Sequence, residues 1–186
     1  MRKNFGQNTW FYPLPVLIVD SYDENGKADA MNAAWGGIYD RNHVILCLSA
    51  GHKTTQNIKA KAAFTVSFAD AAHVVEADYV GLVSANKVDN KLEKAGFHTT
   101  RSQFVDAPVI EELPMTLECR LVKVNEDGKL IGEIVNISAE ERILDEDGNI
   151  DPAKLQAISF DPVNNAYLKL GEKVGNAFGD GAALKE

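Results

Sequence analysis

Residues 25–61, NGKADAMNAAWGGIYDRNHVILCLSAGHKTTQNIKAK, decide the fold that we expect for this chain. The segment opens on an Asn-Gly hairpin turn and continues as a short strand that ends at Asn32. A second strand at 44–48 leads through a small-residue loop into an expected short helix at 54–61. A strand that delivers a small loop to a helix N-terminus favours a bound phosphate, because free backbone N–H groups point outward there.

The charge pattern supports the same position. No Asp or Glu occurs from Arg41 to Ala69, whereas the whole chain has a formal net charge of −8. An acidic chain that keeps one long basic stretch favours an anionic ligand there. An ordinary solvated helix explains the pattern equally well, and both interpretations stay open at this point. The cations of the stretch are Arg41, Lys53, Lys59 and Lys61.

Composition limits the class of protein. The chain has 186 residues, with 45% hydrophobic and 25% charged residues, which suits one soluble globular domain over residues 1–186. A pI near 5.0 argues against nucleic acid or an anionic membrane as the main partner. The N-terminus has no secretory apolar region, and no apolar run reaches the roughly 20 residues of a membrane span. We expect Cys47 and Cys119 to be buried free thiols in a reducing cytoplasm, with a disulfide or catalytic pair as the less favoured alternative.

Alternation and turn residues predict a mainly β protein with short helices. Most of the strands are joined by hairpin turns, such as Asn-Gly at 25–26 and Asp-Gly at 127–128. This arrangement favours an antiparallel β-barrel, and a doubly wound α/β fold is disfavoured because its glycine-rich phosphate motifs are missing. We expect strands at 16–19, 27–32, 44–48, 63–68, 116–121, 130–138, 142–144, 157–160 and 167–170, and short helices at 54–61, 70–80, 86–95, 151–153 and 172–178.

No catalytic or metal-binding motif occurs in the sequence. The four histidines form neither an HExxH motif nor a close set with cysteine, and no GxSxG elbow is present. The acidic turns at 140–147 are better explained as solvated hairpin ends than as paired catalytic carboxylates. We therefore expect no metal site and assign no catalytic residue.

Two further segments are ligand candidates. Gly36 and Gly37 either make a tight turn or let a planar ligand approach the backbone. Trp35 could stack on such a ligand, although we favour core or a dimer interface for its indole. The loop at 84–91 has two lysines and several donors, and could close over a phosphate or ribityl chain. A capped surface helix explains that loop as well.

These motifs, in their order and spacing, resemble the flavin reductase-like, FMN-binding split-barrel family. The resemblance covers nearly the whole chain, and its last two motifs are similar to the flavoredoxin branch. The motifs are Pro13-x-Pro15, the Asn-Gly turn, Ala30 to Trp35, His52-Lys53-Thr54 with Asn57-Ile58, Leu130 to Val135, and Tyr167-x-x-Leu170-Gly171-Glu172-x-x-Gly175-x-Ala177-Phe178.

The resemblance implies a homodimeric antiparallel split β-barrel that binds FMN non-covalently near the subunit interface. Asp29 departs from the family, whose members often have asparagine there, and a carboxylate near flavin would weaken binding or lower the potential unless it points away. The resemblance places Met31, Asn32, Ala33, Ala34 and Trp35 along the isoalloxazine, Ser49, Lys53, Thr54 and Thr55 at the phosphate, Ser84 and Lys91 in the closing loop, and Tyr167 at the C-terminal side. His52 also belongs to the cofactor-binding residues that it implies.

The function that the resemblance implies is that of an FMN-binding oxidoreductase of flavin reductase type. Electrons would pass from NADH, NADPH or a protein donor through FMN to a flavin or an electron-transfer protein, with no side-chain base required. Two alternatives stay open: a flavoredoxin-like electron carrier without nicotinamide activity, and a non-enzymatic flavin-binding module.

Overall fold

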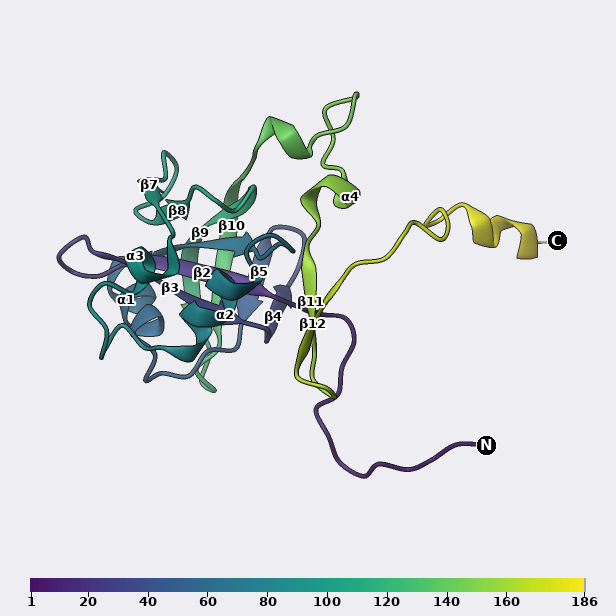
Figure 1. Ribbon diagram of the computed structural model, residues 1–186, viewed down its shortest axis with the longest axis horizontal. Coiled ribbons are helices and arrows are strands. Elements are labelled where there is room, and N and C mark those ends of the chain that lie inside the picture. Colours follow the sequence, from purple (N-terminus) through teal and green to yellow (C-terminus); the bar gives the residue numbers. More distant parts are fainter. Residues whose placement is uncertain (186) are drawn as a thin grey trace.

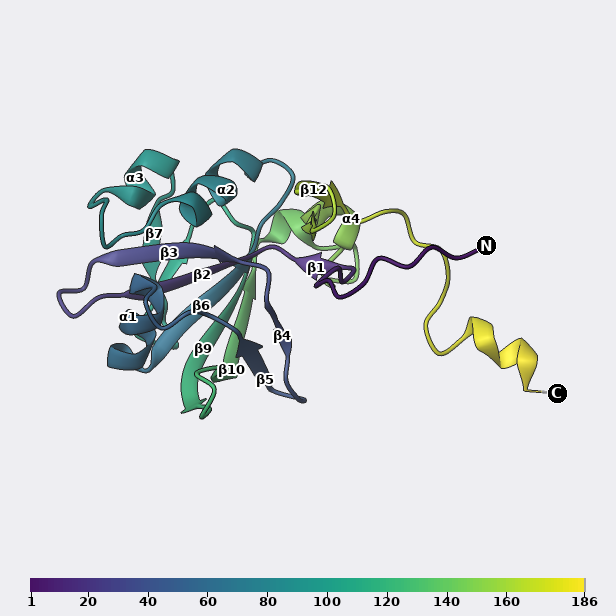
Figure 2. The same cartoon turned by 90° about the horizontal axis from the view of Figure 1, so that it is seen from below.

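An antiparallel sheet of seven strands forms the body of the computed structural model, which describes residues 1–185 (Figure 1). Figure 2 shows the sheet curling, so that β4 and β5 turn away from the plane of β2 and β3. The expected antiparallel split barrel is confirmed. The strand order is β3-β2-β6-β9-β10-β5-β4, with β2 (Leu17–Tyr22), β3 (Ala28–Ala33), β4 (Gly36–Ile38), β5 (His43–Leu46), β6 (Ala63–Phe68), β9 (Met115–Val124) and β10 (Leu130–Ala139).

Smaller sheets and short helices complete the described chain. Helices α2 and α3 cover one face of β2 and β3, and α1 packs from the other side (Figure 2). The small sheets are β1 (Leu14–Pro15) with β11 (Ile158–Asp161) and β12 (Ala166–Lys169), and β7 (Thr99–Arg101) with β8 (Pro108–Ile110). The helices are α1 (Lys53–Lys61), α2 (Val74–Leu82), α3 (Lys91–Ala95), α4 (Pro152–Leu155) and the 3-10 turns η1 (Glu141–Ile143) and η2 (Asp180–Leu184).

Strand β2 is buried on both faces. Successive side chains of a strand point to opposite faces, so Leu17 and Val19 enter the core under α1, and Ile18 enters the core under α2 and α3. A strand covered on both sides has no polar alternation. This explains why the first strand reads as a continuous apolar run.

The β2–β3 hairpin forms at the expected Asn-Gly turn. The Gly26 N–H donates to the Asp23 carbonyl oxygen at 3.0 Å, and Gly26 has a φ of +81°, which suits glycine. The Asp23 carboxylate accepts from the backbone N–H groups of Asn25 and Lys27, both at 2.9 Å. These contacts set the register that places Ala28 opposite Tyr22 and Ala33 opposite Leu17.

The glycine pair lies inside strand β4, so the tight-turn interpretation is wrong. Gly36 pairs with Leu46 and Gly37 with Ile45. A Cβ on Gly36 would lie 2.8 Å from the Leu46 Cδ2 atom and 3.0 Å from the Ile45 carbonyl oxygen. Close packing of β4 on β5 therefore requires glycine at position 36, whereas Gly37 faces open space.

Several expected element boundaries are also wrong. Helix α2 begins at Val74 and not at residue 70, because the Asp70 carboxylate accepts from the N–H groups of Ala72 and His73 and makes a turn. Residues 86–90 form turns before α3, and 141–143 form η1 in place of a strand. Residues 172–178 are irregular and exposed, because an isolated short helix without a packing surface is unstable.

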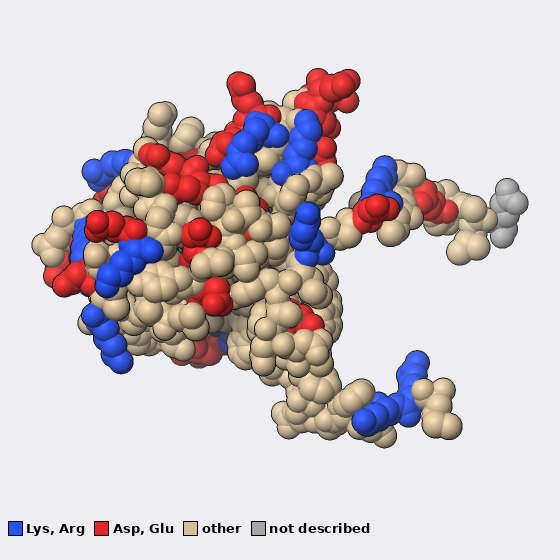
Figure 3. All heavy atoms as spheres, viewed as in Figure 1, with Lys and Arg blue, Asp and Glu red and all other residues tan. Residues whose placement is uncertain are grey.

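Both ends of the chain run away from the barrel (Figures 1 and 2). Residues 1–13 are exposed, and Phe5 packs edge-on against Trp10 with ring centroids 5.3 Å apart. Figure 3 shows Lys and Arg without Asp or Glu on this N-terminal arm, in contrast to the mixed charges on the visible face of the barrel. The C-terminal segment after β12 is exposed as well.

Candidate functional site

Strand β3 forms an edge of the seven-stranded sheet. In that sheet it pairs with β2 on one side, and helices α1, α2 and α3 contact it. An edge strand leaves a row of backbone N–H and C=O groups without a strand partner. Such groups can bind a ligand that lies along β3, except for the Ala30 carbonyl oxygen, which accepts a hydrogen bond from the Lys91 ammonium.

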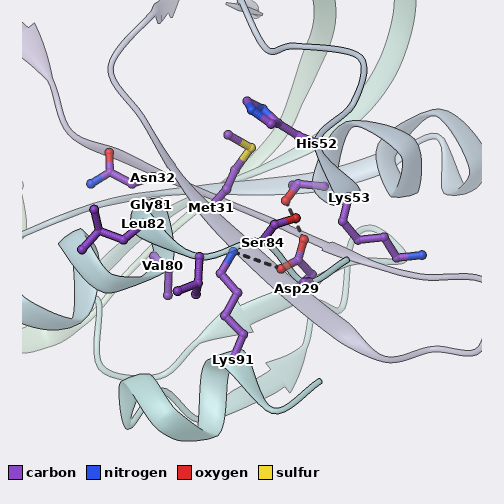
Figure 4. Close-up of a pocket in the computed structure, with 13 residues that line it drawn as sticks. Asp29, Met31, Asn32, His52, Lys53, Val80, Gly81, Leu82, Ser84 and Lys91 are labelled. Atoms are coloured by element: carbon purple, nitrogen blue, oxygen red, sulfur yellow. Dashed lines mark hydrogen bonds and ion pairs between the residues drawn. The ribbon is translucent and has the colours of Figure 1, made fainter. Parts of the chain in front are cut away.

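A groove made of three adjoining hollows follows this edge. The middle hollow has a cavity volume of about 230 Å³ and lies between β3, the start of α1 and the end of α2 (Figure 4). The Tyr167 hollow, about 270 Å³, shares Asn32, Gly81 and Leu82 with it. The Lys53 hollow, about 400 Å³, shares Asp29, Lys53, Ala85 and Lys91 with the middle hollow.

Asp29 lies in the wall between the middle hollow and the Lys53 hollow. Its Oδ2 accepts a hydrogen bond from the Thr54 hydroxyl at 2.6 Å, and its Oδ1 lies 3.4 Å from the Lys91 ammonium (Figure 4). Lys91 also donates to the carbonyl oxygen of Ala30. Burial lowers the pKa of Lys91, and the Asp29 charge opposes that shift. Burial also raises the pKa of nearby Asp20 well above its ordinary value, which favours its neutral form.

Helix α1 begins at Lys53, one residue before the expected start of the helix at residue 54, and His52 is its N-cap. The Thr54 hydroxyl is engaged by Asp29, and the His52 side chain makes no capping bond. The first turn also has no acidic residue. The N–H groups of this turn therefore keep their capacity to bind an anion.

Lys53 and Asn57 extend this anion-binding character into the Lys53 hollow. Lys53 is half-buried, has no ion-pair partner within residues 1–185, and extends away from the Asp29 carboxylate in Figure 4. Asn57 is 3% exposed and lines the same hollow, and its Nδ2 has no hydrogen-bond partner in the described chain. Asn57 is not among the site residues that the sequence predicted. Its spacing of four from Lys53, which puts both on one helix face, was the available signal.

The loop at 84–91 lies opposite the start of α1. This position is the one required for the loop to close over a phosphate or ribityl chain, as the sequence predicted. The Asn86 side-chain amide donates to the Gly51 carbonyl oxygen at 3.2 Å and joins the two loops. Ser84 lines the middle hollow, and its hydroxyl accepts from the Asn86 N–H at 3.2 Å. Lys87 is exposed and lines none of the three hollows.

Tyr167 forms the far wall of the groove together with Asn32. The tyrosine hydroxyl donates to the Asp78 carboxylate at 2.7 Å, and the Asn32 amide donates to the Ala77 carbonyl oxygen at 3.0 Å. Burial and the bond to Asp78 raise the pKa of Tyr167 to about 12, so the phenol stays protonated at neutral pH.

The structure brings most of the predicted site residues together, but not all of them. Thr55 is fully buried and lines none of the hollows, so its hydroxyl does not reach the groove. The Trp35 indole is 56% exposed, which rules out the core position. Ser49 is exposed outside the three hollows, and the Ala33 side chain lies in the core. The groove contains Met31, Asn32, Ala34, His52, Lys53, Thr54, Ser84, Lys91 and Tyr167.

Within residues 1–185, His, Cys, Asp and Glu do not cluster in groups of three or more that suit a metal ion. The helices of the described chain are too short or too polar to span a membrane.

A curled antiparallel half-barrel with a groove along its edge strand is a split β-barrel. Residues 9–155 match the flavin reductase like domain family, and the chain belongs to this family.

Solved structures of similar proteins agree with this assignment. Flavoredoxin of Desulfovibrio vulgaris (Miyazaki F) is 34% identical with a TM-score of 0.94, over 97% of this chain and 100% of that one. Flavoredoxin from Methanosarcina acetivorans is 29% identical with a TM-score of 0.89, over 99% and 100% of the two chains. An FMN-binding domain of a flavin reductase-like enzyme from Shewanella baltica is 20% identical with a TM-score of 0.77, over 87% and 88%, and supports the fold alone.

Proposed function

We propose that the chain binds FMN in the groove along β3 and acts as an oxidoreductase of flavin reductase type. The observation that carries the proposal is the pairing of two features in one groove. Unpaired backbone N–H and C=O groups of edge strand β3 can hydrogen-bond the polar edge of the isoalloxazine ring. The free N–H groups at the start of α1 can bind the phosphate. Membership of the flavin reductase like domain family supports the same ligand.

The residues present fit FMN by position and by chemistry. The backbone of β3 near Met31 and Asn32 would hold the isoalloxazine, while Lys53, Asn57 and the first N–H groups of α1 would hold the phosphate. Asn57 supports the fit, because it lines the Lys53 hollow and its buried amide has no acceptor within the described chain. Bound FMN supplies the redox chemistry, and the protein orients it and shields it from water.

A comparison of FMN with riboflavin tests the ligand. We expect the purified protein to be yellow or to take up FMN, and fluorescence titration to give tighter binding of FMN than of riboflavin. The phosphate adds charge-assisted contacts worth about 1.5–3 kcal/mol, or roughly a tenfold to hundredfold difference in Kd. Equal affinities would remove the phosphate site from the proposal.

The resemblance to the two flavoredoxins favours a second candidate, an electron carrier without nicotinamide activity. Anaerobic stopped-flow mixing of the FMN-loaded protein with NADH and with NADPH separates the candidates. Fast bleaching of the flavin absorbance supports the reductase. Bleaching only by reduced ferredoxin supports the carrier, and resistance to all these donors supports a flavin-binding module without redox function.

We also propose that the protein is a cytoplasmic homodimer. The exposed apolar residues of β4 and its flanks, which include Trp35 at 56% and Ile38 at 70% exposure, suit burial against a second copy. The aromatic N-terminal arm, whose only charged side chains are basic, suits a second copy of a chain whose formal net charge is −8. The free thiols Cys47 and Cys119 suit a reducing compartment. Light scattering should give close to twice the monomer mass of 20.3 kDa, and a monomer with flavin bound would contradict the dimer.

A further inference from the structure

The ion pair between Asp29 and Lys91 is buried in the wall of the proposed flavin groove. Both side chains are only 5% exposed, and they come from strand β3 and from the first residue of α3, 62 positions apart. A buried charge without a partner is costly, so each of these groups depends on the other to stay charged. The pair as a unit is neutral.

Asp29 connects this pair to helix α1. Its second carboxylate oxygen accepts from the hydroxyl of Thr54, which is the second residue of α1 and is 1% exposed. On the other side, Lys91 donates to the backbone oxygen of Ala30. The contacts therefore join α3, β3 and the first turn of α1 at a single point, and this point borders both the middle hollow and the Lys53 hollow.

Lys91 is poorly suited to hold an anionic ligand itself. Two of its three N–H donors are directed to Asp29 and Ala30, and the adjacent carboxylate cancels its charge. Lys53 differs in each respect, because it is half-buried, extends away from the pair in Figure 4 and has no ion-pair partner within residues 1–185. The cation that can meet a phosphate is thus Lys53.

We propose that Asp29 and Lys91 are positioning residues for the start of α1, and that Lys91 does not contact the FMN phosphate. Asp29 holds Thr54, and with it the first turn of the helix, against β3. Lys91 makes this possible by neutralising the carboxylate in a buried position. The choice of FMN as the probe rests on the proposed function, whereas the coupling of the pair to α1 does not.

A double-mutant cycle tests the proposal through FMN affinity and through urea unfolding of the flavin-free protein. Lys91→Met leaves Asp29 unpaired, and we expect a lower unfolding midpoint together with FMN binding weakened about tenfold or more. In the double variant Asp29→Asn/Lys91→Met, the asparagine oxygen still accepts from the Thr54 hydroxyl. We expect this variant to regain the midpoint of the wild type and to bind FMN within about threefold of it.

Several results would overturn the proposal. If the double variant is as stable as the wild type but binds FMN about tenfold more weakly, with riboflavin binding unchanged, Lys91 contacts the phosphate directly. If the double variant is no more stable than Lys91→Met, the pair is not the coupled unit that we describe. Should Lys91→Met fail to fold, the comparison of the double variant with the wild type still decides between the two roles of Lys91.

The control and the two readouts separate this proposal from the proposed function. Lys129→Met removes the lysine of an exposed ion pair with Asp127 and should change neither readout. If the wild type binds no FMN, the proposed function fails, but the urea cycle still tests the pair. Non-additive effects of the single substitutions at Asp29 and Lys91 would support it, and additive effects would refute it.

Discussion

Lys53→Ala tests the anion-binding end of the groove most directly. Lys53 is the first residue of α1, lines both the middle hollow and the Lys53 hollow, and has no ion-pair partner within residues 1–185. Its removal therefore leaves no buried acid without a counter-charge. We expect the free energy of unfolding of the flavin-free variant to stay within about 0.5 kcal/mol of the wild type.

The loss of FMN affinity follows from one charge-assisted contact. Such a contact contributes about 1.5–3 kcal/mol, which corresponds to a roughly tenfold to hundredfold higher Kd for FMN. Riboflavin has no phosphate, so its Kd should hardly change. The difference should shrink as salt is raised, because Lys53 is only half-buried and salt screens its charge.

Fluorescence titration of both flavins at low and high salt measures these effects. Lys59→Ala is the matched control, since Lys59 lies on the same helix, is exposed and lines none of the hollows. Lys87→Ala is a second control on the opposite loop. If Lys53→Ala weakens FMN and riboflavin equally, Lys53 shapes the groove without contacting phosphate. If it weakens neither, the phosphate lies elsewhere and the reasoning from α1 is refuted.

Three further predictions concern the core, the thiols and the far end of the groove. Gly132→Ala places a Cβ 2.3 Å from the buried Phe64 ring and should lower the free energy of unfolding, measured in urea, by about 1–3 kcal/mol. Gly37 faces open space, so the free energy of unfolding of Gly37→Ala should stay within about 0.5 kcal/mol of the wild type. Iodoacetamide should label Cys47 well before Cys119 in native protein by mass spectrometry, because burial raises the pKa of Cys119 to about 12; equal rates would contradict this. The pKa of Tyr167 is raised from 10.0 to about 12, so the stability that Tyr167 contributes is complete below pH 10 and is lost as the pH rises toward 12. The free energy of unfolding of Tyr167→Phe should therefore fall less between pH 9 and 11 than that of the wild type. An equal fall in both proteins would argue against the shift.

The strands could be predicted because their signals are local. Alternation placed β6 at 63–68 without error, and the Asn-Gly turn fixed the β2–β3 hairpin. Where a side chain competed with the backbone, local patterns failed: Asp70 delayed the start of α2 by making a turn of its own. The predicted helix at 172–178 failed for the opposite reason, since the described chain offers it no surface to pack against.

The candidate site could be predicted only in part, because charge along a sequence differs from charge in space. Residues 41–69 contain no acid and for that reason pointed to α1, but in the folded chain Asp29 of β3 contacts Thr54 in the first turn of this helix. Lys91, assigned to a phosphate by resemblance, lies beside that acid. The buried position of Thr55 and the unpartnered amide of Asn57 both depend on how α1 packs on the sheet, which its own sequence does not specify.

The burial of β2 on both faces joins the two hydrophobic cores of the molecule, which could otherwise unfold locally and separately. Its alternate side chains belong to the core under α1 and to the core under α2 and α3, so withdrawal of either layer exposes the same strand. Strand β3 is bonded to β2 along its whole length. Amide protons on both sides of the groove should therefore exchange with solvent through one cooperative opening, while the exposed arms exchange freely. A flavin held at this edge would therefore contact one cooperative unit, because the two layers that flank it share the same central strand.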